Sequence, residues 1–252
     1  MKTIQTILVL SGIIVASLSL NVYLWLSRGD GLKTDETGAK PESVTLQQAE
    51  KTLGCDLSHW DGNVDWHELK DSKVEFVFIK ATQGSNYVDP MFEENWETSK
   101  NYGFIRGAYH FYQPGEDPKV QAAHFLSVVK HEKGDIVPVL DIEISHGEHP
   151  DELTKNISIW IRTVKSAIGR YPIIYTDRAF WNKAIGQDFS YCPLWLAEWE
   201  DAHAPYLPNG WKDWAFWQFS ESGSVEGVSV ETKVDLSHFN GAKSTLRNYQ
   251  LN

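Results

Sequence analysis

Eight short apolar segments recur along the chain from residue 53 onward, and five amphipathic segments separate the first six of them. This alternation constrains the fold more than any other feature. The segment 74–82, VEFVFIKAT, is apolar on both faces over its first six residues, as a parallel strand covered on both sides must be. The eight predicted strands are Leu53–Ser58, Val74–Thr82, Ile105–Phe111, Ile136–Glu143, Tyr171–Thr176, Pro193–Trp199, Trp214–Ser220 and Val234–Phe239.

Helical patterns occupy the segments between these strands. Apolar residues over 153–168 recur at offsets of 4, 7, 8, 11 and 15 residues, and Gly169 is a typical helix end. Asp117 as N-cap and Pro118 in the first turn predict a second helix that runs to about Lys133. Weaker patterns predict helices over Val64–Asp71, Pro90–Tyr102 and Arg178–Ile185.

Strands that alternate with helices predict an α/β fold with a parallel sheet, and eight strands predict closure into a barrel. No helical pattern separates the last three strands, so we expect an irregular TIM-like barrel of eight strands and five helices, (β/α)5β3. An internal match supports closure, because DLSHWDG at 56–62 recurs as DLSHFNG at 235–241. Strands one and eight are neighbours in a closed barrel, so we expect these two loops side by side at one rim, with chance resemblance as the alternative.

The first 52 residues differ in composition from the rest. Residues 7–26 carry no charge and are long enough to span a bilayer. The apolar run continues past Ser17 and Ser19, the only small pair suited to signal cleavage, so we favour an uncleaved anchor over a cleaved signal peptide. Residues 27–52 are polar and turn-rich, which predicts a linker. We therefore expect a membrane anchor or signal segment at 1–26, a linker at 27–52 and a barrel at 53–252 that lies outside the cytoplasm.

The net charge excludes one large class of function. The chain has 34 acidic and 23 basic side chains, a net charge of −11, and no cluster of Lys or Arg. Nucleic-acid binding through phosphate neutralisation needs a basic face, so we expect no nucleic-acid partner. The two cysteines, Cys55 and Cys192, are too few for a disulfide framework or a four-ligand zinc site. We expect Cys55 to be a buried free thiol that faces the helices.

Four acids fall at the ends of predicted strands: Asp56, Asp141, Glu143 and Asp235. Asp141 and Glu143 are two residues apart on one strand, so both point to the same side, and the apolar VPVL before them delivers both to the rim of the barrel interior. Crowded carboxylates repel each other, which raises the proton affinity of at least one. An acid that stays protonated beside ionised ones is what glycosidic bond cleavage requires.

Metal binding is the main chemical alternative for these carboxylates. The spacing and the glycine of a calcium loop are absent, so we expect no metal and no other cofactor. His146 and His149 lie in a polar loop with Glu148, and a plain surface loop explains them better than a zinc site.

Aromatic residues are unusually abundant, with 11 tryptophans, and most of them are expected in the core. Several others fall at predicted strand ends. Because sugar rings stack on aromatic faces, this rim favours a saccharide cleft. The aromatic residues concerned are Trp60, Tyr109, Tyr175, Trp199 and Trp217.

Nine motifs follow one another from Gly54 to Gly241: GCDLSHWDGNVDW, FVFIKATQG, DPMFEENW, IRGAYHFYQP, VPVLDIE, YPIIYTDRAFW, LWLAEW, WAFWQFS and VDLSHFNG. This ordered set resembles glycoside hydrolase family 25, the Chalaropsis-type lysozymes. The resemblance implies hydrolysis of the β-1,4 bond between N-acetylmuramic acid and N-acetylglucosamine in peptidoglycan.

The resemblance also implies roles for individual residues. Glu143 would be the proton donor and Asp141 its neighbour at the reacting sugar, either as nucleophile or by orienting the N-acetyl oxygen of the substrate. Gln83 stands where the KATEG motif has Glu, which predicts a difference in rate or pH range. Asp56 and Asp235 would be the flanking acids, and Tyr109, Tyr175, Trp199 and Gln218 would line the groove.

Two other functions remain open. A chitinase-like hydrolase would carry more acids before the final Glu, where this chain has Pro138, Val139 and Leu140. The second function is that of a catalytically silent wall-binding module tethered to the membrane, and Gln83 is the only residue that favours it. In each case we expect a monomer that contacts the peptidoglycan strand and, through its N-terminal segment, the membrane.

Overall fold

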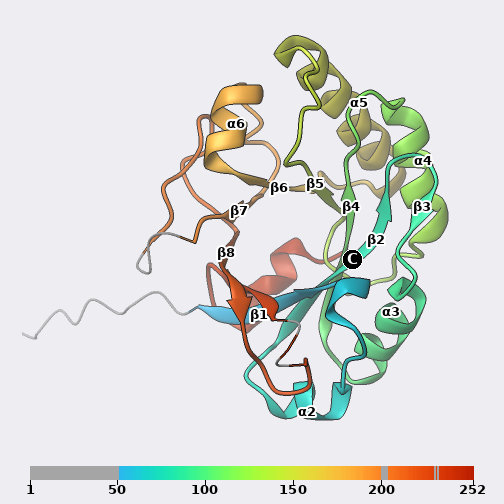
Figure 1. Ribbon diagram of the computed structural model, residues 1–252, viewed down its shortest axis with the longest axis vertical. Coiled ribbons are helices and arrows are strands. Elements are labelled where there is room, and N and C mark those ends of the chain that lie inside the picture. Colours follow the sequence, from blue (N-terminus) through green and yellow to red (C-terminus); the bar gives the residue numbers. More distant parts are fainter. Residues whose placement is uncertain (1–50, 200–203, 230, 232) are drawn as a thin grey trace, which may run out of the picture. The chain divides into compact units, whose positions relative to one another are not determined.

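Eight strands close a barrel in the computed structural model, which describes residues 51–199, 204–229, 231 and 233–252 (Figure 1). The order around the sheet is β1-β9-β8-β7-β6-β5-β4-β2, and the pairing of β1 with β2 closes it, while the short β3 extends from β2. The predicted irregular barrel and all eight of its strands are confirmed. The strands are β1 (Thr52–Leu57), β2 (Phe76–Gln83), β3 (Tyr87–Val88), β4 (Ile105–Phe111), β5 (Val139–Asp141), β6 (Ile173–Asp177), β7 (Leu194–Ala197), β8 (Phe216–Gly223) and β9 (Val234–Phe239).

The five predicted helices are also present. Aspartates cap three of them: the side chains of Asp65, Asp117 and Asp177 accept backbone N–H groups at the starts of α2, α4 and α6. The helix expected to reach Lys133 ends earlier, because Val129 adopts an extended conformation. The α-helices are α2 (Trp66–Asp71), α3 (Phe92–Asn101), α4 (Pro118–Val128), α5 (Pro150–Ile168) and α6 (Arg178–Ala184), and two 3-10 helices that were not predicted are η1 (His59–Asp61) and η2 (Lys243–Tyr249).

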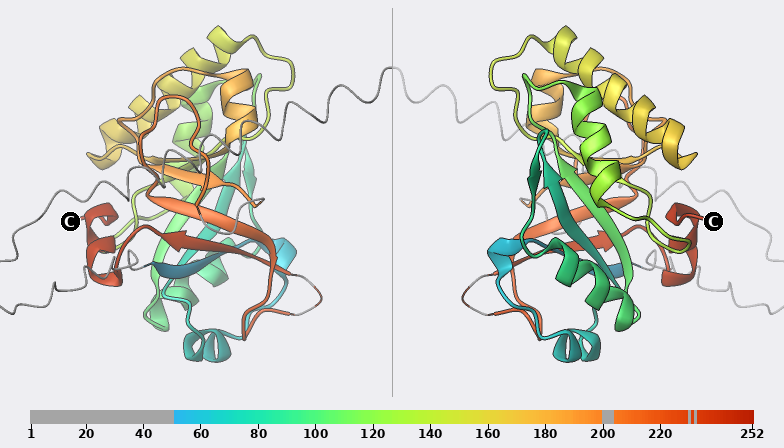
Figure 2. Two further views of the ribbon diagram at one scale, coloured as in Figure 1. Left: turned by 90° about the vertical axis from the view of Figure 1, so that its left-hand side faces the viewer. Right: turned by 90° about the vertical axis from the view of Figure 1, so that its right-hand side faces the viewer.

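The strands of the barrel are buried on both faces. In β2, Val77 and Ile79 pack in the cluster shared with the helices, whereas Phe76 and Phe78 pack in the barrel interior. Helices α4 and α5 lie side by side against the outside of the barrel (Figure 2). The apolar stripe of α5 faces the core as predicted, since Leu153, Ile157, Trp160, Ile161 and Val164 are all buried.

Aromatic rings fill the barrel interior. Phe78 stacks on Trp195 with ring centroids 4.2 Å apart, and Phe216 packs edge-on against Phe78 at 5.1 Å. Gly54 makes room for this filling, because a Cβ atom there would lie 2.3 Å from the ring of Phe76. At one end η2 adds the buried Leu246 to the same cluster. The interior is therefore closed at the end where η2 lies.

Strand β9 runs antiparallel to both of its neighbours, so the expectation of a parallel sheet throughout was wrong. The physical reason is the short connection from β8: a hairpin of about ten residues joins antiparallel strands, whereas a parallel crossover needs a dozen or more. The two similar loops consequently lie at opposite ends of the β1–β9 pair. Trp60 follows the end of β1, whereas Gly241 accepts a hydrogen bond from the Thr52 hydroxyl at 2.8 Å, at the start of β1.

Several other predictions concern residues outside the active-site region. Cys55 and Cys192 are buried free thiols, and Cys55 packs in the helix-side cluster as expected. His146 is exposed, and His149 caps the start of α5. The predicted anchor or signal segment and all of the linker except Lys51 and Thr52 lie outside the described residues. Within the described ranges, no helix has the length and hydropathy needed to cross a bilayer.

Candidate active site

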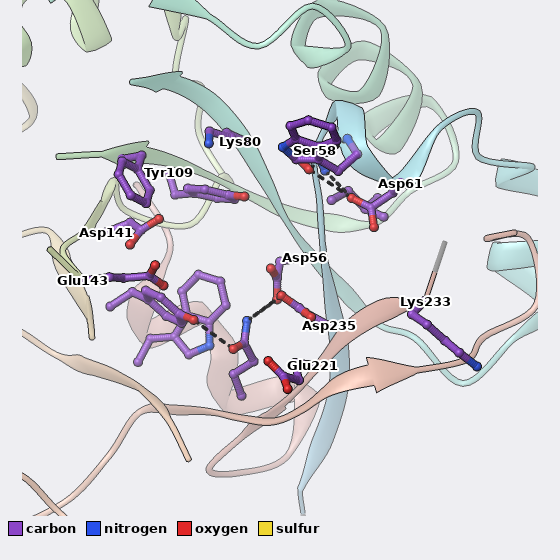
Figure 3. Close-up of a pocket in the computed structure, with 16 residues that line it drawn as sticks. Asp56, Ser58, Asp61, Lys80, Tyr109, Asp141, Glu143, Glu221, Lys233 and Asp235 are labelled. Atoms are coloured by element: carbon purple, nitrogen blue, oxygen red, sulfur yellow. Dashed lines mark hydrogen bonds between the residues drawn. The ribbon is translucent and has the colours of Figure 1, made fainter. Parts of the chain in front are cut away.

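A cavity of about 320 Å³ opens at the rim where β1, β5 and β6 end (Figure 3). The structure brings all four predicted acids, Asp56, Asp141, Glu143 and Asp235, to its walls. No group of three or more His, Cys, Asp or Glu side chains among the described residues is arranged to hold a metal ion.

Asp141 and Glu143 reach the cavity because the chain alternates sides at the end of β5. Ile142 between them is fully buried in the helix-side cluster, and its amide donates to the carbonyl of Tyr175 at 3.0 Å. The Asp141 carbonyl accepts the Tyr112 amide at 2.8 Å. The Asp141 side chain is only 5% exposed, whereas that of Glu143 is exposed in the cavity mouth. The two carboxyls therefore share one side of the chain but differ in contact with solvent.

The electrostatic surroundings hold protons on this pair. Burial raises the pKa of Asp141 well above its usual range, and the neighbouring Glu143 raises it further. Partial desolvation by the cavity walls raises the pKa of Glu143, although its side chain is open to solvent. A hydrogen bond with Tyr175 lowers that pKa, and the charge of Asp177 raises it. Lys80 opposes the rise at both carboxyls. Such a pair titrates as a unit, and one of its two carboxyls retains a proton to higher pH than a free acid would.

Asp56 and Asp235 form a second acidic pair across strands β1 and β9. They are direct partners in the antiparallel register, and the Gln218 side-chain amide donates to Asp56 Oδ2 at 3.1 Å and to Asp235 Oδ2 at 3.2 Å. Burial, followed by the charge of Asp235, raises the pKa of Asp56 well above its usual range. Burial, followed by the charges of Asp61 and Glu221, raises the pKa of Asp235 to about 6. Gln218 thus links two acids that repel each other.

Gln218 also connects this pair to two of the predicted aromatic residues. Its Oε1 accepts from the Tyr175 hydroxyl at 2.8 Å and from Trp199 Nε1 at 3.2 Å. Tyr109 lines the same cavity, and Trp60 stands at the rim with 76% of its surface exposed. One carboxamide therefore holds both acids and two groove aromatics in a fixed arrangement.

Trp217 does not line the cavity, which corrects its proposed place in the saccharide cleft. Side chains alternate along β8, and Gln218 faces inward, so Trp217 faces outward. It is 2% exposed, and its Nε1 donates to the carbonyl of Glu198 at 2.7 Å. Trp217 is therefore a packing residue.

Two further cavities adjoin the central one. The first, of about 430 Å³, shares Glu143 and Tyr175 with it and is lined by Trp199. The second, of about 450 Å³, shares Trp60 and Lys80 with it. The binding region is thus longer than the central cavity alone.

Sequence reasoning missed four charged residues in the central cavity. Lys80 continues the spacing of two set by Phe76 and Phe78 on the inward face of β2. The alternation of side chains along a strand is therefore a signal that could have predicted its position. Asp61 forms a capping box with Ser58, a spacing readable from the sequence. Glu221 and Lys233 come from the β8–β9 hairpin, for which no sequence signal exists.

The barrel and its site define a class of protein. Two pairs of carboxylates with raised pKa values lie at the open end of a filled barrel, beside exposed aromatic rings. This arrangement is typical of a glycoside hydrolase.

Comparison with known proteins identifies the family. Residues 55–228 match the profile of glycosyl hydrolases family 25. Lysozyme M1 of Streptomyces globisporus is 34% identical over 224 residues, which cover 83% of this chain and 75% of the relative. The N,O-diacetylmuramidase of Chalaropsis sp. is 31% identical over 192 residues, covering 69% and 90%. The crystal structure of the bacterial lysozyme from Streptomyces coelicolor superposes with a TM-score of 0.75 at 34% identity, covering 80% of this chain and 97% of that one. The chain belongs to glycosyl hydrolases family 25.

Proposed function

We propose that the protein is a muramidase that hydrolyses the β-1,4 bond between N-acetylmuramic acid and N-acetylglucosamine in peptidoglycan. The observation that carries the proposal is the Asp141–Glu143 pair at the cavity mouth, one carboxyl buried and the other open to the substrate. The names of its relatives, a lysozyme and an N,O-diacetylmuramidase, support the choice of substrate.

Glu143 is the proton donor in this proposal. Its raised pKa keeps the proton available, and its carboxyl is accessible at the junction of the central cavity and the cavity lined by Trp199. The proton passes to the glycosidic oxygen as the C–O bond breaks, and the resulting carboxylate then accepts a proton from the attacking water.

In the reactive form of the pair the retained proton lies on Glu143, so the ionised Asp141 faces the positive charge that develops at the anomeric carbon. It either bonds to that carbon as a nucleophile or orients the N-acetyl oxygen of the substrate to attack. Its burial makes electrostatic stabilisation strong, because little water screens it.

The remaining site residues bind and orient the sugar. Asp56, Asp235 and Gln218 offer hydrogen-bonding groups at the centre of the cavity. Aromatic rings at the rim stack on the apolar faces of sugar rings. These are Trp60, Tyr109, Tyr175 and Trp199.

The test is release of reducing ends from purified peptidoglycan and, in parallel, from chitin. We expect release from peptidoglycan and little from chitin. A preference for chitin would favour a chitinase-like hydrolase. Binding to cell walls without release of any reducing ends would favour a silent wall-binding module.

We also propose that the enzyme acts outside the cytoplasm, held at the membrane by residues 7–26. This rests on the length and apolar character of that segment. Membrane fractionation of the full chain and of a chain lacking residues 1–26 tests it, and recovery of the full chain in the soluble fraction would contradict it. We expect a monomer by size-exclusion chromatography and activity that is unchanged by metal chelators.

A further inference from the structure

The cavity that joins the central one at Lys80 and Trp60 contributes only the ring of Trp60 to the mechanism described above. It lies between η1, the β2–β3 hairpin and the loop that follows β4. We call it the side pocket and define it by Trp60, Lys80, Gln83, Asn86, Gln113 and Glu116. Its volume of about 450 Å³ is larger than that of the central cavity.

The walls of the side pocket are held in place by hydrogen bonds. The Glu116 carboxylate accepts the Ser85 amide at 2.7 Å, and Gln121 accepts the Gln113 amide at 2.9 Å. Gly84, with a φ of 56°, brings the hairpin close to Glu116, where a Cβ atom would lie 3.0 Å from the carboxylate. The pocket is therefore formed before a ligand arrives, which reduces the entropic cost of binding.

Carboxamides dominate the middle of the pocket. Lys80 Nζ donates to Gln83 Oε1 at 3.2 Å, and Gln83 Nε2 donates to Gln113 Oε1 at 3.4 Å. Asn86 is exposed beside them. A carboxamide donates and accepts at once, so it pairs well with the amide groups of a peptide backbone.

Charges of opposite sign stand at the two ends of this carboxamide row. Lys80 lies at the junction with the central cavity, and Glu116 lines only the side pocket. In a glycan strand without peptides, the lactyl carboxylate of muramic acid complements Lys80, but no positively charged group is available for Glu116. A short peptide with a carboxylate near the sugar and an amino group farther out complements both ends.

The side pocket branches from the central cavity. In Figure 3, Glu143 and Lys233 lie on opposite sides, with Asp56 and Asp235 between them, and Lys80 stands off to one side of that line. A glycan strand that follows this line does not occupy the side pocket, which remains open to a substituent on one of the sugars. Muramic acid carries a peptide as such a substituent.

We propose that the side pocket binds the peptide attached to muramic acid, with Lys80 facing a carboxylate, Gln83 and Gln113 facing backbone amides, and Glu116 facing an amino group. The inference rests on the proposed muramidase function and adds a preference for peptide to it. Binding of the peptide in the side pocket makes the enzyme selective for peptide-bearing over peptide-free glycan.

The experiment compares kcat/KM, measured by reducing ends, on soluble peptide-bearing glycan strands and on the same strands after an amidase has removed the peptides. We expect the unmodified enzyme to favour the peptide-bearing strands at least fivefold. Glu116→Gln, which keeps an acceptor for Ser85 and removes the charge, and Gln113→Ala should each reduce that preference at least threefold through KM. Their kcat/KM on stripped strands should stay within twofold of the unmodified enzyme.

Glu94→Gln, an exposed acid on α3 outside the three cavities, is the matched control, and thermal melting checks that each variant is folded. Equal cleavage of both materials by the unmodified enzyme would overturn the inference alone. A variant that lost activity equally on both would make the pocket a sugar subsite and would also overturn it. Failure to cleave either material would overturn the proposed function, and the inference with it.

Discussion

Asp56 and Asp235 lie directly opposite each other on antiparallel strands β1 and β9, and one side-chain amide, that of Gln218, donates to both. That amide carries no positive charge, so it does not neutralise either carboxylate. Because burial and the charges of neighbouring acids favour their protonated forms, the arrangement costs stability at neutral pH. Such a cost is typical of residues kept for function.

Replacement of Asp235 by Asn should stabilise the protein at neutral pH. The folded-state pKa of about 6 lies above the ordinary value of 3.8, so the folded state binds more protons than the unfolded state between these values. Stability therefore falls as pH rises through roughly 4 to 6, and the variant loses this penalty. We expect Tm at pH 7 to rise by about 2–4 °C, equivalent to about 1 kcal/mol for a domain of this size. Between pH 4 and pH 7, the Tm of the variant should fall less than that of the unmodified protein. Asp71→Asn, at an exposed site on α2, is the control, and a lower Tm for the Asp235 variant at pH 7 would contradict the argument.

Replacement of Glu143 by Gln should reduce the hydrolysis of peptidoglycan by about 10²–10⁴-fold, because the variant has no proton to donate. The side chain is exposed, so Tm should change little. Reducing-end release measures the effect. Glu221→Gln serves as the control, since Glu221 is an exposed acid in the same cavity with no proposed role in proton transfer, and it should keep most of the activity. Normal clearing of cell walls by the Glu143 variant would remove Glu143 from the mechanism.

Replacement of Gln83 by Glu should move the alkaline limb of the pH profile to higher pH. Lys80 lowers the pKa of Asp141 and Glu143, and a carboxylate at position 83 would pair with Lys80 and weaken that effect. The pKa values of both acids then rise, so Glu143 keeps its proton to higher pH. The pH dependence of kcat/KM tests this, with Gln83→Ala as the uncharged control. A limb that moves to lower pH, or that moves equally in both variants, would refute it.

Loss of the ring at Trp60 or Trp199 should weaken substrate binding more than it weakens the fold. Trp60 is 76% exposed and Trp199 is 47% exposed, so little packing is lost when either becomes Ala. We expect KM to rise about fivefold, which corresponds to about 1 kcal/mol, with kcat nearly unchanged. Tyr191→Ala is the control, because Tyr191 is 48% exposed and precedes β7, away from the cavity end of the strands. An equal rise in KM for the control would mean that the rim rings are not specific contacts.

The sequence predicts the barrel well because its strands are apolar on both faces. Phe76 and Phe78 alternate with Val77 and Ile79, and the structure divides them between the interior and the helix side. The direction of β9 was not predictable in the same way, since alternation has a period of two in either direction. Asp235 was expected at the end of a parallel strand, and it reaches the rim near the start of an antiparallel one.

Placement of individual side chains depended on knowing which face of each strand turns inward. Asp141 and Glu143 were placed together because their spacing of two fixes their relation to each other, whatever the face. Trp217 was misplaced because its position at a strand end says nothing about its face. Lys233 and Glu221 depend on the path of a hairpin, which the sequence does not specify.

The aromatic filling of the barrel has a consequence for how a polymer is cut. η2 and the rings of Phe76, Phe216 and Phe239 fill the barrel interior beneath the cavity, so substrate and products share the mouth at the opposite end. The adjoining cavity lined by Trp199 extends that mouth sideways over the rim. A long strand can lie across such an opening without threading a free end into it. The shape therefore suits endo-acting cleavage, in which internal bonds break at random and chain length falls before small fragments accumulate.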